Sequence, residues 1–201
     1  MDNFKTAIEL MGLRRHDCHP ELPRDKEFKG IDLGGGAISL EEAHFIKGVI
    51  SVVKPDVVIE LGTSLGASAI AIGSVLKDFG KGELITVDFA KDAPPRALEL
   101  DAKLELPIYW VSSDSLKFLE TFEVDEKKRY LVFSDTDIPQ RPEEVMRTID
   151  KFPEGTFILV HDTSDLHPFG PMHLKKTLLE NGYSPDIIEL PSPRGISILK
   201  V

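Results

Sequence analysis

Short runs of β-branched residues alternate along this chain with longer stretches in which apolar residues recur at the period of a helix. This alternation predicts an α/β fold, a doubly wound, Rossmann-like sheet of mostly parallel strands with helices on both faces. Five strands of this kind are expected, and each is followed by a helical stretch. They lie at residues 57–59, 84–88, 108–112, 130–134 and 157–160.

The carboxyl-terminal part of the chain departs from this alternation. Two more strands are expected at 187–190 and 196–201, and only the segment 191–195 separates them. A parallel crossover needs about a dozen residues, so these two strands are predicted to form an antiparallel hairpin. The expected sheet therefore has seven strands, and its final strand runs against the others. That combination is not typical of nicotinamide dehydrogenases.

A helix expected before the first strand marks the start of the domain. Ser39 and Glu42 have the spacing of a capping box, and Pro55 ends the apolar periodicity that follows them. With 201 residues and 41% hydrophobic content, the chain is long enough to bury one core. We therefore predict a single domain over residues 39–201, preceded by an N-terminal extension or lid segment over residues 1–38.

Charge and hydropathy narrow the expected partners and location. The chain has 24 Lys and Arg against 34 Asp and Glu, and no stretch gathers the basic residues for a phosphate backbone, so nucleic acid is not expected. Residues 1–20 lack the apolar core of a signal peptide, and the longest uncharged run, Leu61–Leu76, is shorter than the roughly 20 apolar residues that span a bilayer. Cys18 is the only cysteine, which favours a reducing compartment. We expect a cytoplasmic protein with no membrane partner.

A glycine-containing loop directly follows the first buried strand and leads into a helix. It has the form E-x-G-x-x-x-G, in which the two glycines allow a tight turn and let a ligand touch the backbone. Loops that cradle the phosphates of dinucleotides have the closer spacing G-x-G-x-x-G. An acidic residue at the mouth of the loop favours a ligand with a cationic amino group. The candidate binding residues here are Glu60, Gly62, Thr63, Ser64, Gly66 and Ser68.

Aspartates follow the next two strands. Asp88 ends the second strand, where a carboxylate can accept from both hydroxyls of a ribose, or it caps the turn. Asp114 follows the third strand and either faces an adenine amino group or caps the next helix, and the two roles are compatible. These residues by themselves imply an adenosine-like ligand with an amino acid end.

With this loop, Asp88, Asp114 and the closing hairpin, residues 40–201 resemble the class I S-adenosylmethionine-dependent methyltransferases. The resemblance implies that the cofactor is S-adenosylmethionine.

Acidic loops follow the fourth and fifth strands at the same edge of the sheet. Asp135, His161 and Asp162 offer oxygen and nitrogen ligands for one divalent cation such as Mg²⁺, which would lower the pKa of a bound hydroxyl. The arrangement resembles the metal-dependent O-methyltransferases of catechol and caffeoyl type, and more closely a bacterial branch that includes relatives of cephalosporin hydroxylase. Ile138 stands where the catechol-type enzymes carry a lysine base, so His161 and Asp135 become the candidate catalytic residues. Alternatively, the two aspartates satisfy loop amides and His161 is a partly buried polar residue.

The sequence therefore predicts methyl transfer to an oxygen of a small-molecule acceptor, with or without assistance from a metal. Two alternatives remain, a nucleotide-binding protein without turnover and an NAD-dependent oxidoreductase on a similar fold. A homodimer is compatible with a small enzyme of this fold.

Overall fold

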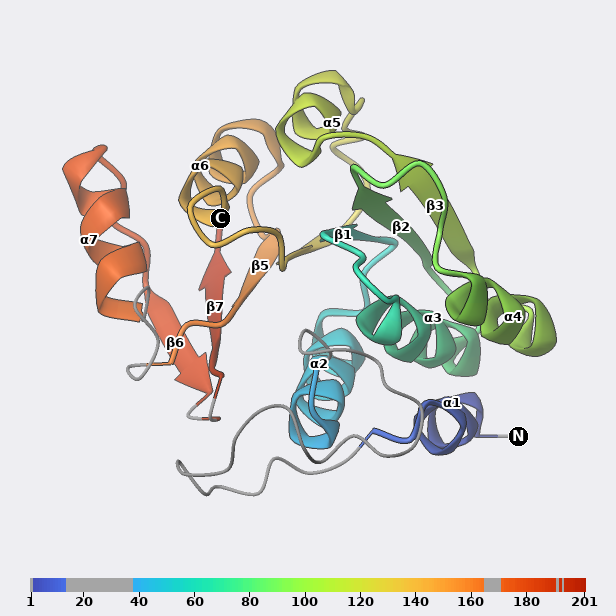
Figure 1. The fold of residues 1–201 in the computed structure, drawn as a ribbon. Coiled ribbons are helices and arrows are strands. Elements are labelled where there is room, and N and C mark those ends of the chain that lie inside the picture. The colour runs from blue at the N-terminus through green and yellow to red at the C-terminus, as the bar shows by residue number, and fades with distance from the viewer. Residues whose placement is uncertain (1, 14–37, 165–170, 191, 193) are drawn as a thin grey trace.

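The computed structural model describes residues 2–13, 38–164, 171–190, 192 and 194–201. Its strands form one seven-stranded sheet in the order β3-β2-β1-β4-β5-β7-β6 (Figure 1). The strands are β1 Val57–Leu61, β2 Glu83–Asp88, β3 Ile108–Ser112, β4 Tyr130–Ser134, β5 Phe157–His161, β6 Ile187–Leu190 and β7 Ile196–Lys200. Strands β1 to β5 pair in parallel, whereas β7 is antiparallel to both β5 and β6. The predicted fold, with its closing hairpin, is confirmed.

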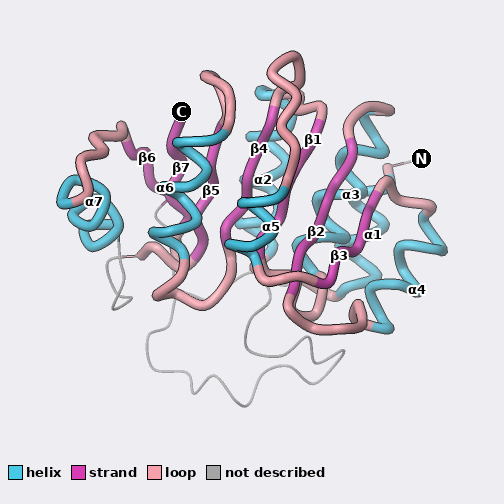
Figure 2. Tube along the Cα trace, turned by 90° about the horizontal axis from the view of Figure 1, so that it is seen from above, coloured by secondary structure: helices cyan, strands magenta, loops and turns pink. Residues whose placement is uncertain are grey.

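Helices cover both faces of the sheet. They are α1 Asn3–Met11, α2 Leu40–Val53, α3 Ala67–Phe79, α4 Pro95–Leu104, α5 Ser115–Thr121, α6 Arg141–Lys151 and α7 Pro171–Glu180. Helices α1 to α4 lie on one face, and α5 to α7 lie on the other (Figures 1 and 2). In the described part of the chain, no helix combines the length and the apolar character that crossing a bilayer requires.

The central strands explain why functional groups collect at one edge. Every residue of β1 and β4 is buried, as expected for strands covered on both faces. These strands run in parallel with β2, β3 and β5, so the loops that leave their carboxyl ends emerge together.

Helix α2 begins as the sequence predicts. The Ser39 amide donates to the Glu42 carboxylate at 2.8 Å, and the Glu42 amide donates to the Ser39 hydroxyl at 3.2 Å, which completes the capping box. The helix ends at Lys54, directly before Pro55. Both capping residues are buried.

Helix α1 was not expected as part of the core. Phe4, Ala7 and Met11 are buried against the rest of the domain, and Asp78 of α3 accepts hydrogen bonds from the amides of Asn3 and Phe4. Residues 3–11 therefore pack as part of the domain, although the sequence assigned them to an extension or lid. The remainder of that predicted segment, 14–37, lies outside the described residues.

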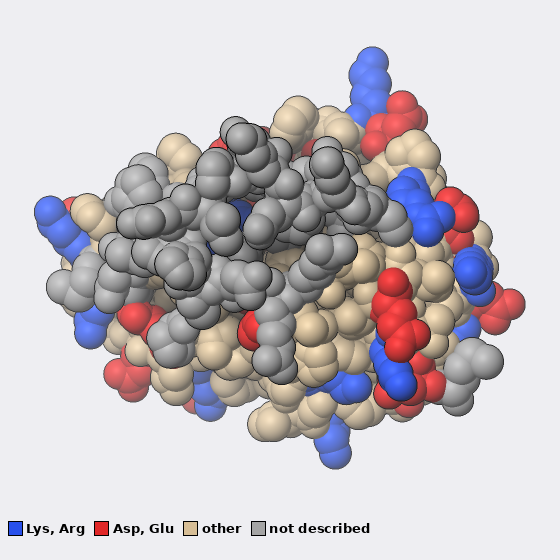
Figure 3. Space-filling view, turned by 60° about the horizontal axis from the view of Figure 1, so that its bottom comes forward, with Lys and Arg blue, Asp and Glu red and all other residues tan. Residues whose placement is uncertain are grey.

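Figure 3 shows one face of the molecule. Basic residues are scattered among acidic ones over the described part of this face and do not gather into a stripe. The absence of a nucleic-acid partner, which the sequence analysis expects, stays a prediction.

Candidate functional site

The loop after β1 is held in conformations that favour glycine. Gly62 and Gly66 have φ angles of +93° and +81°, and the Gly62 amide donates to the Val87 carbonyl at 2.8 Å. A Cβ atom at position 62 would stand 2.4 Å from the carbonyl oxygen of Asp135. The glycine therefore lets the loop after β1 rest directly on the loop after β4.

Glu60 lies beneath this loop rather than at its mouth. Its side chain is fully buried, and Oε2 accepts a hydrogen bond from the Thr86 hydroxyl at 2.5 Å. Among the described atoms, Oε1 has no hydrogen-bond partner. Burial raises the pKa of Glu60 to about 8, against the lowering effect of the Ser68 and Thr86 hydroxyls. Ser68 is itself buried at the start of α3.

Asp88 holds the loop by its backbone. Its Oδ2 accepts hydrogen bonds from the amides of Thr63 and Ser64 at 3.0 and 2.9 Å, and Oδ1 accepts from the Ala90 amide at 2.9 Å. The capping role that the sequence left open is thus present. Asp88 also lines a pocket that Thr63, Ser64 and Trp110 share. Asp88 therefore both holds the glycine loop and lines the pocket next to that loop.

Asp114 caps α5. Its Oδ1 accepts a hydrogen bond from the Lys117 amide at 3.0 Å, and Gln140 Nε2 donates to its Oδ2 at 3.4 Å. The cap that the sequence offered as one alternative is present, and a contact with adenine stays a prediction.

The three predicted reaction-site residues come together at the ends of β4 and β5. Ligand atoms of Asp135, His161 and Asp162 all lie within 4.8 Å of one another. His161 Nδ1 lies 2.9 Å from Asp135 Oδ1 and 3.8 Å from Asp162 Oδ2. The His161 side chain is fully buried, whereas that of Asp135 is 12% exposed. Of these two candidate catalytic residues, Asp135 is the one that a substrate could touch.

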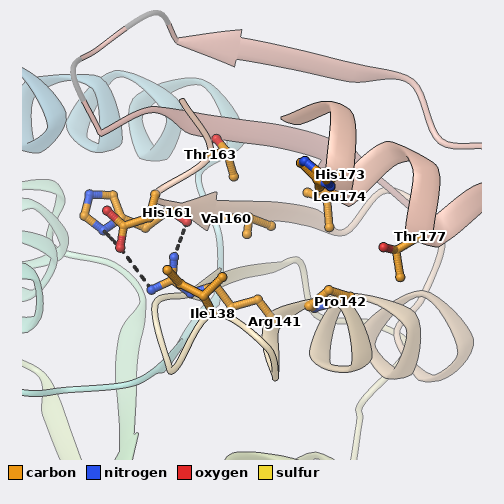
Figure 4. Close-up of a pocket in the computed structure, with 10 residues that line it drawn as sticks. Ile138, Arg141, Pro142, Val160, His161, Thr163, His173, Leu174 and Thr177 are labelled. Atoms are coloured by element: carbon orange, nitrogen blue, oxygen red, sulfur yellow. Dashed lines mark hydrogen bonds and ion pairs between the residues drawn. The ribbon is translucent and has the colours of Figure 1, made fainter. Parts of the chain in front are cut away.

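Two arginines that the sequence analysis missed bind these carboxylates. Arg141, at the start of α6, places one guanidinium nitrogen 3.0 Å from Asp135 Oδ1 and 3.2 Å from Asp162 Oδ2. It also donates to the carbonyls of Thr136 and His161, and Figure 4 shows it reaching His161 from α6. Arg194, before β7, approaches Asp162 with Nε 2.5 Å from Oδ1 and a terminal nitrogen 2.8 Å from Oδ2.

Glu42 closes the cluster from the side of α2. Its Oε2 lies 3.3 Å from His161 Nε2, an ion-pair distance without the angle of a hydrogen bond. The Ser192 hydroxyl donates to Oε1 at 2.9 Å. Burial alone would lower the pKa of His161, but the carboxylates of Asp135 and Glu42 outweigh it and raise that pKa to about 9.

Local sequence patterns contain little that points to these added groups. In the sequence, Glu42 is accounted for by its place in a capping box, and Arg141 is the first residue of a helix, where an arginine indicates no particular function. Arg194 lies in a turn, 32 residues from the Asp162 it binds. Only the tertiary structure shows which arginines lie next to the predicted carboxylates.

The donor set fits a metal ion poorly as it stands. The distances among Asp135, His161 and Asp162 would suit one cation. However, guanidinium groups already engage both carboxylates. A cation would have to displace these contacts.

A second pocket adjoins this cluster between β5, α6 and α7 (Figure 4). Arg141, His161 and Asp162 form its polar end. Apolar side chains supply much of the remaining wall, among them Ile138, Pro142, Val160 and Leu174.

Comparison with protein families identifies one match. Residues 59–163, slightly more than half of the chain, match a family model described as a methyltransferase domain. The matched range begins within β1 and includes the glycine loop, Asp88, Asp114 and the acidic loops. No curated protein matches the sequence.

Solved structures share the fold at low sequence identity. The O-methyltransferase TomG from Streptomyces achromogenes, involved in tomaymycin synthesis and in complex with S-adenosylmethionine, is 16% identical, with a TM-score of 0.67 over 100% of this chain and 90% of that one. The Podospora anserina methyltransferase PaMTH1, bound to S-adenosylhomocysteine, is 16% identical, with a TM-score of 0.68 over 99% and 87%. An O-methyltransferase from Bacillus cereus in complex with S-adenosylhomocysteine is 14% identical, with a TM-score of 0.67 over 100% and 91%.

Proposed function

Because this chain belongs to the methyltransferase-domain family, we propose that it transfers the methyl group of S-adenosylmethionine to an oxygen atom of a small-molecule acceptor. The observation that carries the proposal is the contact between the glycine loop and the loop of Asp135. This contact places the predicted cofactor-binding loop next to the loop that carries the predicted catalytic residue Asp135. The named O-methyltransferases with this fold, bound to S-adenosylmethionine or its product, support the same ligand here.

The residues of the first three strand ends suit the cofactor. The adenosine part would occupy the pocket lined by Thr63, Ser64, Asp88 and Trp110, where Asp88 has acceptor oxygens for ribose hydroxyls. The amino acid end would lie along the glycine loop at Gly62 and Gly66, under which the side chain of Glu60 is buried. When bound, S-adenosylmethionine supplies an electrophilic methyl group on a sulfonium centre.

Asp135 is the residue proposed to act on the acceptor. It is partly exposed, while His161 and Arg141 fix its carboxylate from behind at 2.9 and 3.0 Å. As the acceptor oxygen forms its bond to the methyl carbon, the bond from that carbon to the sulfonium sulfur breaks, S-adenosylhomocysteine leaves, and Asp135 takes up the hydroxyl proton. His161 then acts as a positioning residue, because its buried ring reaches the acceptor only through Asp135.

Metal assistance, a small-molecule acceptor, a cytoplasmic location and a homodimer remain predictions from the sequence. The arginine contacts favour a form of the reaction without a metal. Neither alternative function, NAD-dependent oxidation or binding without turnover, gains an observation that favours it.

Calorimetric titration of the full chain with S-adenosylhomocysteine and with NAD, each with and without Mg²⁺, tests the cofactor assignment. We expect S-adenosylhomocysteine to bind and NAD not to bind. Binding of NAD, or of neither ligand, would overturn the proposal.

A transfer assay tests the reaction itself. Methyl-labelled S-adenosylmethionine is incubated with pools of hydroxylated small molecules, and label on an acceptor oxygen is the expected result. Asp135→Asn should retain S-adenosylhomocysteine binding and lose transfer, because it removes the proton acceptor. Asp137→Asn, an exposed carboxylate in the same loop, is the matched control and should transfer normally.

A further inference from the structure

We propose that the guanidinium groups of Arg141 and Arg194 occupy the place at the ends of β4 and β5 where the sequence predicts a divalent cation, so that the reaction centre works without a metal. The inference rests on the proposed function in one respect, because it takes the cluster of Asp135, His161 and Asp162 to be the reaction centre. The carboxylates concerned are those of Asp135 and Asp162, the two predicted acidic ligands.

The first support is geometric. One nitrogen of Arg141 lies between the two carboxylates, 3.0 Å from Asp135 and 3.2 Å from Asp162. This bridging position is the one that a metal ion shared by both carboxylates would take. Arg194 engages both oxygens of Asp162 through two nitrogens, the paired geometry in which arginine binds a carboxylate most strongly.

The second support is charge balance. Two guanidinium groups bring the same two positive charges that one divalent cation would bring, and they face two carboxylates. The side chains of Arg141 and Asp162 are 7% and 6% exposed, so an additional double charge would be poorly solvated. Arginine also keeps its proton under all conditions in which proteins are folded.

The third support is that the backbone builds this arrangement. The Arg194 carbonyl accepts from the Ser164 amide at 2.8 Å, and the Gly195 carbonyl accepts from the Thr163 amide at 3.3 Å. A Cβ atom at Gly195 would stand 2.3 Å from the Ser164 nitrogen. The turn before β7 is thus packed directly on the loop after β5, which fixes Arg194 against Asp162.

On the other side, the main chain fixes Arg141. Its guanidinium donates to the carbonyls of Thr136 and His161 as well as to the carboxylates. An arginine held by two backbone carbonyls cannot swing aside without leaving these acceptors unpaired. Both cationic groups are therefore positioned by the fold rather than resting on the cluster from solvent.

Binding of Mn²⁺, a probe that accepts the same oxygen and nitrogen ligands, tests the inference on the full chain after dialysis against a chelator. For the wild type we expect no saturable binding below about 1 mM, the weak end of protein cation sites, with or without S-adenosylhomocysteine. The melting temperature should be the same in EDTA and in Mn²⁺. Saturable binding below about 1 mM that Asp162→Asn abolishes would overturn the inference.

Arg141→Met tests whether the bridging guanidinium is what keeps a cation out. It removes the charge and retains most of the aliphatic stem, so we expect Mn²⁺ binding to appear and the melting temperature to rise when Mn²⁺ is added. Arg147→Met, on the solvent side of α6, is the matched control and should bind no Mn²⁺. A folded Arg141→Met protein that binds no more Mn²⁺ than the wild type would also count against the assignment.

The wild-type measurement decides the question even if Arg141→Met does not fold. Failure of the proposed function is distinguishable, because it would appear as absent S-adenosylhomocysteine binding whatever the result with Mn²⁺.

Discussion

Gly62 lies directly against the backbone of Asp135, and a Cβ atom at position 62 would stand 2.4 Å from the Asp135 carbonyl oxygen. The Asp135 amide in turn donates to the Leu61 carbonyl at 2.8 Å. The loop predicted to bind a cofactor and the loop predicted to carry the reaction are thus one packed unit. A disturbance of either loop is expected to reach the other.

Gly62→Ala should destabilise the protein by about 3 kcal/mol, because alanine tolerates neither a φ of +93° nor the contact with Asp135. Chemical denaturation measures this loss, and calorimetry should show that S-adenosylhomocysteine binding is lost with it. Gly48→Ala is the control, since nothing lies within 4 Å of a Cβ atom there, and it should stabilise α2 by about 0.5–1 kcal/mol. Equal effects of the two substitutions would contradict the packing argument.

Glu60→Gln should be more stable than the wild type, and this difference in the free energy of unfolding should grow as the pH rises. Burial raises the pKa of Glu60 from 4.5 to about 8, so between these values the unfolded chain releases a proton that the folded protein keeps. The stability of the wild type therefore falls across this window and levels off above it, whereas glutamine does not titrate. Denaturation at both ends of the window should show the advantage of Glu60→Gln growing with pH.

The same variant separates stability from function. Glu60→Gln should bind S-adenosylhomocysteine as the wild type does at pH 7, because Glu60 is buried beneath the glycine loop and keeps its proton there, so that the amide replaces an uncharged group. Glu123→Gln, at an exposed position, should follow the wild type in both measurements. A pH dependence of stability that Glu60→Gln leaves unchanged would show that Glu60 is not its source.

Asp88→Asn should cost about 1–3 kcal/mol of stability, because one amide group cannot accept from the amides of Thr63, Ser64 and Ala90 together. With the loop loosened, the affinity for S-adenosylhomocysteine should fall about tenfold or more. Calorimetry and thermal unfolding check the two effects. Asp92→Asn, an exposed carboxylate lining the same pocket, should leave stability unchanged.

Phe4→Ala should destabilise the protein by about 3–4 kcal/mol, the usual loss for a buried aromatic side chain. Phe4 is 3% exposed and packs edge-on against His44 of α2. Val52→Ala is the control, because Val52 lies on α2 and is 82% exposed. It should change the free energy of unfolding by less than about 0.5 kcal/mol. Normal stability of Phe4→Ala would mean that α1 is a detachable extension, as the sequence suggested.

Local patterns predicted much of the fold because the signals they carry are local. The five parallel strands follow from apolar runs, and their observed bounds differ from the expected ones by two residues or fewer. The hairpin of β6 and β7 follows from the short segment that joins them. Helix α1 was missed although Phe4, Ala7, Ile8 and Met11 have helical spacing, because so short a helix gains its stability from packing on α3.

The sequence by itself determined the glycine loop and the acidic strand ends, since backbone conformation and chain order dictate both. Only the tertiary structure decided what surrounds those acids. Arg194 meets Asp162 across 32 residues, and Ser192 meets Glu42 across 150. Such partners are chosen by the packing of a hairpin and a helix onto the sheet, and no local periodicity encodes them. For that physical reason, the sequence indicated a possible metal site at Asp135, His161 and Asp162 but not the two guanidinium groups that bind its carboxylates.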